Sequence, residues 1–477
     1  MIANIFGIGS DLDVFFASNT LNVVLVGVSL SAINFALTPL LVKHYKASEF
    51  RKLRELSNSV FNSFLVIFLL ISVLQLLLAK TLVGWLLPGF SGEQKVLTVF
   101  FFKFQAFLSV IVVLTGVLTA LHYTLKRYYR TILVPALSQL VYLGFVFWGH
   151  SQLGLYSLVY GLAISQVFTF VLLGISFLRH YRPKILFNQE FGDAVRKIYP
   201  LMLAGAFGRS NLIIDRFFAS ALEGGSITIL QYGNKIIEMI SGFLNRGVSI
   251  VTLRSFSMME HDNARLKNES FIAYKAILFF VILFLVGIIF FLRDFLGMVA
   301  LTKQFTSKDV LEIYLVALSL LGVLIGGSLS GVVVNVFYSK GLTSIVSKVD
   351  AVAQVFGIGL KIAMFYVIGF WGLPLAFSIQ SLGMTLILLL LLHKNVYSVE
   401  FMALIKYAAK LMLLGLLAVT LPKLLFVLYL ESFAGLILAG GLFFLLFFAV
   451  TYVDKNEICR AIVSRLYARL SEPAKAI

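Results

Sequence analysis

Several charged side chains lie inside long apolar stretches of this sequence. A charge at the middle of a membrane-spanning helix costs about 2.5–3.5 kcal/mol on insertion scales, so such residues are candidates for ligand binding. Cations at such positions suit an anionic group such as a phosphate, and nearby carboxylates can hold those cations in place. Lys361 fits a packing role or a binding role equally well. The candidate binding residues are Asp13, Arg209, Asp215, Lys235, Glu238 and Lys361.

The spacing of these charges indicates which of them share a helix face. Lys235 and Glu238 are three residues apart and lie on one face. They either neutralise each other, or Glu238 holds a cation that is presented to an anionic ligand. Arg209 and Asp215 are six residues apart and do not face each other, although Arg209 can point into the same space as Lys235. Arg216 lies near a predicted helix end, where we expect its side chain to reach the membrane surface.

The composition indicates a membrane protein built of helices. Of the 477 residues, 60% are hydrophobic and 13% are charged, which is about half the charge of a soluble domain. The apolar runs repeatedly reach the roughly 20 residues that a spanning helix needs. The run 382–392 shows none of the alternating polarity of a β-barrel strand. We therefore predict an all-α, polytopic bundle of about thirteen transmembrane helices.

The predicted spanning helices follow from the positions of the apolar runs. They cover residues 11–42, 58–87, 97–125, 131–149, 154–179, 198–222, 226–253, 269–293, 308–338, 342–368, 371–393, 401–429 and 432–453.

The net charge of +17 reflects membrane topology rather than nucleic-acid binding. Basic residues gather in alternate connections, including those at 43–54, at 126–130 and in the tail from 455 to 469. This positive-inside pattern predicts a multi-pass protein of the bacterial inner membrane with a cytoplasmic C-terminus. The single cysteine, Cys459, excludes an internal disulfide framework and a multi-cysteine metal site.

The start of the chain suggests a further helix upstream. Thirteen spans with a cytoplasmic C-terminus place Met1 outside, directly before the polar link Gly7–Asp11. That link resembles the connection that follows a helix, so we hypothesise that a first helix precedes this reading frame.

An internal repeat relates two parts of the chain at an offset of 215 residues. The matched pairs are Gly116 and Gly331, Tyr123 and Tyr338, Gln139 and Gln354, and Gly144 and Gly359. The repeat predicts an N-terminal lobe over residues 1–182 and a homologous C-terminal lobe over 183–397, followed by two extra helices and a basic tail over 398–477. Duplicated lobes are typical of transporters, which place their site between the lobes at mid-membrane.

The sequence carries no pattern of enzymatic catalysis. HExxH, GxSxG, a P-loop and a cysteine pair are all missing from it. The connections are also too short to hold a separate catalytic domain. We therefore expect a protein that is not an enzyme and that needs no metal or cofactor, apart from a coupling cation whose identity the sequence leaves open. It carries no signal of an oligomeric state.

Several motifs resemble one family of membrane proteins. The segment Phe6–Ala17, followed by Ala36–Pro39, is similar to the opening of the MurJ/MviN lipid II flippases, which runs FGxG, then DAFF, then small residues ending in Pro. Asn211–Ser220, with Gly225–Ile227 and Gln231–Lys235, resembles the NxxID, FAS, GS and YANR elements of that family. Residues 337–340 resemble its FYAxxD/K element. The family belongs to the MOP exporter superfamily.

This resemblance implies a fold and a function. It implies two lobes around a cationic cavity and the outward movement of a polyprenyl-diphosphate-linked saccharide for peptidoglycan or another exported polysaccharide. Asp13 matches the family's functionally important acidic residue, and Lys235 takes the place of its cavity arginine. The family's arginine pair after DAFF falls here on the apolar Leu25 and Val26. Lysine also lacks the bidentate fork of arginine, so the carried saccharide stays open between lipid II and another lipid-linked glycan.

Three other functions remain as alternatives. A MATE-like cation-coupled exporter prefers an acidic cavity for a cationic drug, whereas the second lobe here is net basic. A membrane glycan ligase or polymerase usually has a large outer loop, and the outer connections here are short. A non-transporting pseudo-transporter scaffold is the third alternative. The partners that we expect are a lipid-linked oligosaccharide and membrane lipid, without nucleic acid.

Overall fold

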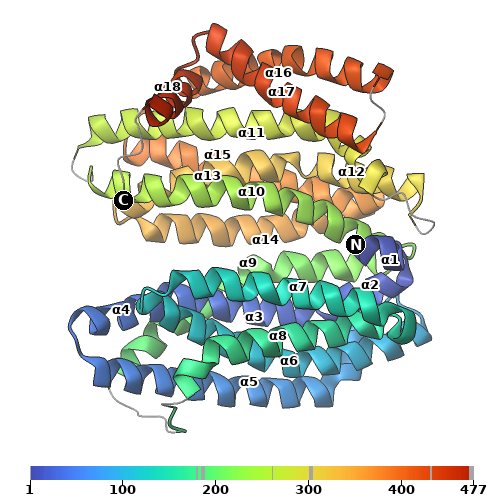
Figure 1. The fold of residues 1–477 in the computed structure, drawn as a ribbon. Helices are drawn as coiled ribbons and strands as arrows, with labels where there is room; N and C mark the ends of the chain where they lie inside the picture. Colours follow the sequence, from blue (N-terminus) through green and yellow to red (C-terminus); the bar gives the residue numbers. More distant parts are fainter. Residues whose placement is uncertain are drawn as a thin grey trace. The chain divides into compact units, whose positions relative to one another are not determined.

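The structure is a computed structural model that describes residues 2–178, 181–183, 189–259, 262–299, 305–429 and 432–471. Within these ranges the chain is helical and contains no β-strand (Figure 1). The elements are α1 (Ile2–Phe6), α2 (Ser10–Ser18), α3 (Thr20–Ala32), the π-helix η1 (Ile33–Leu37), α4 (Thr38–Lys46), α5 (Phe50–Leu86), α6 (Gly92–Thr124), α7 (Tyr128–Leu153), α8 (Tyr156–Leu178), α9 (Gln189–Ala219), α10 (Ser226–Ser257), α11 (Asn263–Val299), α12 (Ser307–Ser319), α13 (Leu321–Ser339), α14 (Thr343–Ile368), the short 3-10 helix η2 (Gly369–Trp371), α15 (Gly372–Asn395), α16 (Phe401–Tyr429), α17 (Phe433–Val453) and α18 (Glu457–Ser471).

The helices have the length and composition of membrane spans. Ten stretches of the described residues are long and apolar enough to cross a membrane. One of them, Thr343–Asn395, contains both α14 and α15, and the more polar helices α9 and α10 are not among the ten. Counting α14 and α15 separately and adding α9 and α10 gives the thirteen helical segments predicted from the sequence. The predicted fold class is confirmed.

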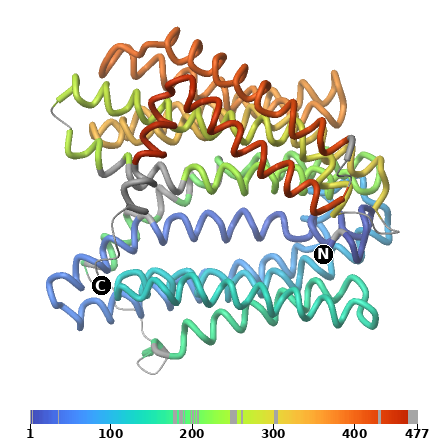
Figure 2. Tube along the Cα trace, turned by 45° about the horizontal axis from the view of Figure 1, so that its top comes forward, coloured from blue at the N-terminus to red at the C-terminus, as the bar shows by residue number. Residues whose placement is uncertain are grey.

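The chain divides into two compact units, unit 1 (Met1–Thr228) and unit 2 (Ile229–Ile477). In unit 1, α5 packs along α6, α7 along α8, and α3 along α9. In unit 2, α15 packs against both α13 and α14, and α16 and α17 lie against α11 (Figure 2). This division reflects packing, whereas the predicted boundary at 182/183 reflects the repeat, so the predicted domain limits stay a prediction.

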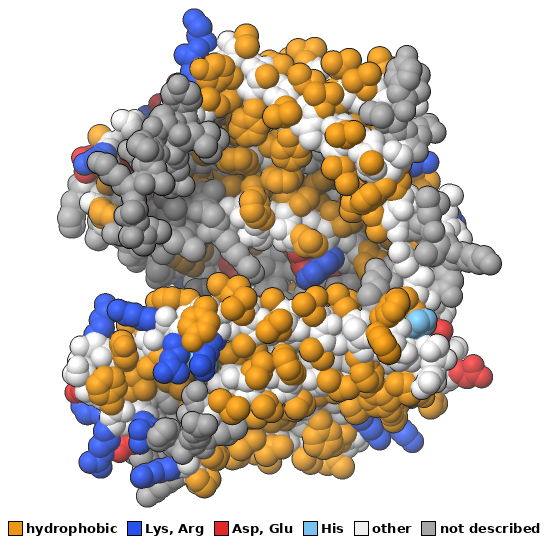
Figure 3. All heavy atoms as spheres, viewed as in Figure 1, with side chains coloured by type: hydrophobic (Ala, Val, Ile, Leu, Met, Phe, Trp, Pro, Cys, Tyr) orange, Lys and Arg blue, Asp and Glu red, His pale blue; other side chains and the backbone are white. Residues whose placement is uncertain are grey.

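Each unit has an apolar core that the spanning helices share. The core of unit 1 contains Phe61, Phe64 and Phe68 of α5 among its buried side chains. A cluster in unit 2 joins α11 to the two extra helices, and it contains Phe279 of α11, Leu411 of α16 and Phe443 of α17. Many large apolar side chains remain exposed outside these cores, and Figure 3 shows them as broad apolar areas on the visible face of both units. Such faces are stable in contact with lipid.

Local signals set where several helices begin. Ser91 accepts a hydrogen bond from the backbone N–H of Gln94, and the Gln94 side chain accepts one from Ser91, which forms a capping box at the start of α6. Thr306 and Asp309 form the same arrangement at α12. Helix α5 begins at Phe50, earlier than predicted, because charged residues extend it beyond its apolar run.

The structure supports the internal repeat. Helices α7 (Tyr128–Leu153) and α14 (Thr343–Ile368) each contain 26 residues, and both begin and end at the offset of 215. The next residues, Gly154 and Gly369, both have a positive φ, of 52° and 64°. Glycine adopts this conformation without the steric penalty of a side chain, so both copies end this helix with the same turn.

Candidate functional site

Asp13 is buried and accepts three hydrogen bonds. It lies in the first turn of α2 and is 3% exposed. One carboxylate oxygen accepts a hydrogen bond from the backbone N–H of Gly225 at 2.6 Å. The other accepts from the backbone N–H and the hydroxyl of Thr228, both at 2.7 Å. The first N–H groups of a helix lack partners within the helix, so Asp13 satisfies two donors at the start of α10 and complements its dipole.

Arg216 completes this buried cluster, and its position corrects the sequence-based expectation. We expected its side chain to reach the membrane surface, but the residue is 5% exposed. Its Nη1 donates a hydrogen bond to the backbone carbonyl of Ile227 at 2.9 Å, and the guanidinium lies 6.0 Å from the centre of the Phe16 ring. It also interacts electrostatically with Asp13 and Asp215. The cluster therefore joins the start of α2, the end of α9 and the start of α10.

Two glycines allow these segments to approach closely. Gly225 has a φ of 99°, and a Cβ on it would lie 2.9 Å from the side chain of Ile8. A Cβ on Gly224 would overlap the hydroxyl of Ser10. A side chain at either position would push the start of α2 away from the turn before α10, which explains why both segments are glycine-rich.

Arg209 extends across helix α3 within unit 1. Its residue is exposed, and its Nη2 donates to the hydroxyl of Ser31 at 3.3 Å. The guanidinium lies over Gly27, where a Cβ would overlap it. A larger residue at position 27 would displace the cation. Asp215 on the same helix is half-buried, and the described contacts associate it with Arg216 instead.

Lys235 and Glu238 lie on one face of α10, as their spacing predicted. Their ammonium and carboxylate are 3.4 Å apart. Both side chains are well exposed, at 61% and 67%. An exposed pair of this length contributes at most about 1 kcal/mol, so the ammonium can exchange its carboxylate partner for an anionic ligand at little cost.

Lys361 differs from the exposed cations. It lies in α14 and is completely buried, and its ammonium is 5.0 Å from the centre of the Phe377 ring of α15. In this structure its side chain does not reach the surface, because α15 covers that face of α14. Direct contact with a ligand would require these two helices to rearrange, and the binding role of Lys361 stays a prediction.

Clusters of metal-ligating side chains are absent from the described residues. Within the ranges given above, no group of three or more His, Cys, Asp or Glu side chains could hold a metal ion.

The motifs that surround these residues belong to a known family. The family model described as "Lipid II flippase MurJ" matches residues 2–447. The chain belongs to the MurJ lipid II flippase family. This membership, with the ten candidate spans, identifies a multi-span protein of the bacterial inner membrane.

Individual members of the MurJ family are distant relatives. The chain is 24% identical to a probable lipid II flippase MurJ of Vibrio cholerae over 409 residues, which cover 80% of this chain and 76% of that protein. It is also 24% identical to a probable MurJ of Rhizobium tropici over 299 residues, or 57% of this chain. That alignment spans 55% of the length of the Rhizobium protein.

Solved structures share the fold of the chain. One is described as lipid II flippase MurJ in an inward closed conformation, with a TM-score of 0.79 and 22% identity over 95% of both chains. An inward-facing MATE multidrug transporter of the MOP superfamily has a TM-score of 0.69 and 13% identity over 85% of this chain and 93% of that chain. At these identities the likeness is one of fold, which MurJ and MATE proteins have in common.

Proposed function

We propose that this protein moves a polyprenyl-diphosphate-linked saccharide, either lipid II or another lipid-linked glycan precursor, across the inner membrane. The observation that carries this proposal is the match to the lipid II flippase family over residues 2–447. The matched segment contains all six candidate residues as well as Arg216. We therefore propose a transporter rather than an enzyme.

The chemistry of the exposed cations supports this proposal. A diphosphate and a saccharide cannot enter hydrocarbon without partners for their charges and hydroxyl groups. Arg209 and Lys235 are both exposed and can pair with phosphate oxygens, the arginine through two parallel hydrogen bonds. Glu238 holds the ammonium of Lys235 until the ligand arrives. Buried Asp13 instead positions α10, the helix that carries Lys235.

Transport would proceed by alternating access, as in other proteins with duplicated lobes. We place the C-terminus in the cytoplasm on the basis of the basic connections. A membrane potential that is negative inside would assist outward movement of the headgroup. Two negative charges gain roughly 4–5 kcal/mol per 100 mV if the charges of the protein stay in place.

Departures from the family's arginines bear on which saccharide is carried. Lys235 stands where the family has an arginine, and Leu25 and Val26 stand where it has an arginine pair. Fewer arginines mean fewer bidentate phosphate contacts. The carried headgroup is therefore either lipid II or a lipid-linked glycan that needs fewer such contacts.

Reconstitution of the full chain in proteoliposomes tests this function. Fluorescent lipid II and a second fluorescent polyprenyl-diphosphate saccharide are supplied in one leaflet, and arrival in the other leaflet is measured by quenching with an impermeant reductant. We expect flipping of at least one of them above the rate of protein-free vesicles. No flipping of either lipid, together with proton- or sodium-driven export of a cationic dye, would replace the proposal with the MATE-like alternative.

A further inference from the structure

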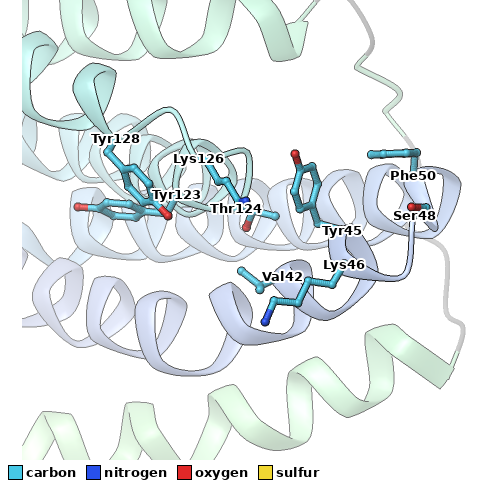
Figure 4. A pocket seen from close by; sticks show the side chains of 9 residues that line it. All are labelled: Val42, Tyr45, Lys46, Ser48, Phe50, Tyr123, Thr124, Lys126 and Tyr128. Atoms are coloured by element: carbon cyan, nitrogen blue, oxygen red, sulfur yellow. The ribbon is translucent and has the colours of Figure 1, made fainter. Parts of the chain in front are cut away.

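A hollow lies at one end of unit 1, where two helix connections meet. It has a volume of about 470 Å³ and is lined from the α4–α5 connection and from the α6–α7 connection (Figure 4). Its lining includes Tyr45, Lys46, Phe50, Tyr123, Lys126 and Tyr128. None of these residues belongs to the candidate transport site.

The hollow carries positive charge that its neighbours do not compensate. Neither Lys46 nor Lys126 forms an ion pair within the part of the chain that the structure describes, and both are exposed. The carboxylate of Glu49 is bound instead by His44 at 2.7 Å and by Lys52 at 3.0 Å. Hydrogen bonds from these two residues lower the pKa of the Glu49 carboxyl. This carboxylate is therefore engaged, and the two ammonium groups remain available to an external anion.

Two non-glycine residues at the hollow have a backbone conformation that disfavours any side chain. Among the described residues, a positive φ occurs outside glycine at Ser48, Lys126 and Lys455, and the first two line the hollow. Lys126 has a φ of 58°. At the equivalent position of the repeat stands Gly341, with a φ of 71°. A lysine pays a steric penalty there that glycine avoids, which points to a role for its ammonium group.

Four aromatic rings line the same hollow as the two lysines. Tyr123 and Tyr128 pack with ring centres 6.1 Å apart, and Tyr45 and Phe50 meet edge to face at 6.0 Å. Phe50 and Tyr128 are more than half exposed although they lie at the ends of membrane-spanning helices. Aromatic residues at helix ends are typical of the membrane–water interface, so the hollow lies at the level of lipid headgroups.

We propose that this hollow binds the phosphate of an anionic membrane phospholipid. The ammonium groups of Lys46 and Lys126 pair with the phosphate oxygens, and the aromatic rings contact the glycerol and the first carbons of the acyl chains. The volume is in the range of pockets that hold small ligands. A bound headgroup holds the α4–α5 and α6–α7 connections together, since each connection supplies one of the two lysines.

The test measures lipid binding by the full-length protein in a neutral detergent. The probes are phosphatidylglycerol, the zwitterionic phosphatidylcholine and inorganic phosphate, and the readouts are lipid adducts in native mass spectrometry and the shift of the melting temperature. A lysine near an anionic membrane surface contributes about fivefold in affinity, so Lys46→Gln with Lys126→Gln weakens phosphatidylglycerol binding by about 30-fold. The matched control is Lys80→Gln with Lys95→Gln, which removes the same charge at the other ends of α5 and α6.

The outcomes answer two questions: whether the hollow binds an anion, and whether that anion is a phospholipid or free phosphate. Stabilisation by phosphatidylglycerol alone supports the site and assigns it to lipid. Stabilisation by inorganic phosphate as well also supports the site, with the phosphate group as the recognised part. Equal affinity of phosphatidylglycerol for the wild type and the Lys46/Lys126 variant overturns the proposal, as does equal stabilisation by phosphatidylglycerol and phosphatidylcholine.

Discussion

The charged cluster at Asp13 and the charged pair at Lys235 are built in opposite ways. The Asp13 carboxylate is 3% exposed and accepts three hydrogen bonds from Gly225 and Thr228. The Lys235–Glu238 pair is more than 60% exposed on both sides and is joined by one contact at 3.4 Å. The hydrogen-bonding capacity of the Asp13 carboxylate is used by the protein itself, whereas the exposed ammonium of Lys235 is accessible to a ligand.

This difference separates two roles that look alike in the sequence. A buried carboxylate whose oxygens cap a helix cannot also bind a substrate without uncovering backbone donors, which costs about 1–3 kcal/mol for each donor. An exposed ion pair exchanges partners at little cost. We therefore propose that Asp13 positions α10 and that Lys235 contacts the ligand.

The largest effect is expected from Asp13→Asn, which changes the buried cluster of Asp13 and Arg216. The amide group replaces one accepting oxygen by a donor that faces a backbone or hydroxyl donor. Arg216 also loses one of its two negative partners, since Asp215 remains. We expect a loss of about 2–4 kcal/mol of stability, seen as a lower melting temperature in detergent, and a loss of most flipping activity.

Asp11→Asn is the matched control, since Asp11 lies on the same helix and is exposed. It should leave both the melting temperature and flipping unchanged. An Asp13→Asn protein with the melting temperature and flipping rate of the wild type would contradict the structural role of the Asp13 cluster and its contrast with the Lys235–Glu238 pair.

A smaller effect is expected from Glu238→Gln, which changes the exposed Lys235–Glu238 pair. The ammonium of Lys235 loses a competing carboxylate, and the stability of the protein hardly depends on an exposed pair. We expect an unchanged melting temperature and about threefold tighter binding of a short-chain polyprenyl-diphosphate saccharide. Isothermal titration in detergent measures this affinity. Weaker binding would show that Glu238 itself contacts the headgroup.

The smallest effect on stability is expected from exchanging lysine and glycine between equivalent turns of the two copies of the repeat. The turn after α6 has Lys126 where the turn after α13 has Gly341, and both residues have a positive φ. Lys126→Gly removes the side chain that is disfavoured in this conformation and should stabilise the protein by about 1 kcal/mol. Gly341→Lys should destabilise it by a similar amount. Thermal unfolding of both variants tests this, and a less stable Lys126→Gly protein would show that the lysine contributes packing.

Much of the fold could be predicted from the sequence because hydrophobic length directly encodes a spanning helix. The thirteen apolar runs all became helices, and the offset of 215 residues holds for both ends of α7 and α14. Helix α18 was not predicted, since its 15 residues are amphipathic and too polar to span a membrane. Its residues were expected to form a basic tail.

The candidate site could be predicted only in part. The spacing of Lys235 and Glu238 fixes their shared face, because that relation lies within one helix. Arg216 was misplaced because its partner is a backbone carbonyl, at Ile227, which leaves no signal in a sequence. The burial of Lys361 depends on how α14 is rotated against α15, and hydrophobicity alone does not determine that rotation.

The central proposal is that Arg209 and Lys235 are each needed to bind the diphosphate of the transported lipid. Flipping of a fluorescent lipid-linked saccharide in proteoliposomes, compared between the wild type and Arg209→Ala with Lys235→Ala, tests it most directly, with Lys235→Arg as the charge-preserving control. We predict that the double variant keeps its melting temperature and loses at least tenfold in flipping rate, whereas Lys235→Arg retains activity. Flipping at the wild-type rate by a well-folded double variant would contradict the claim.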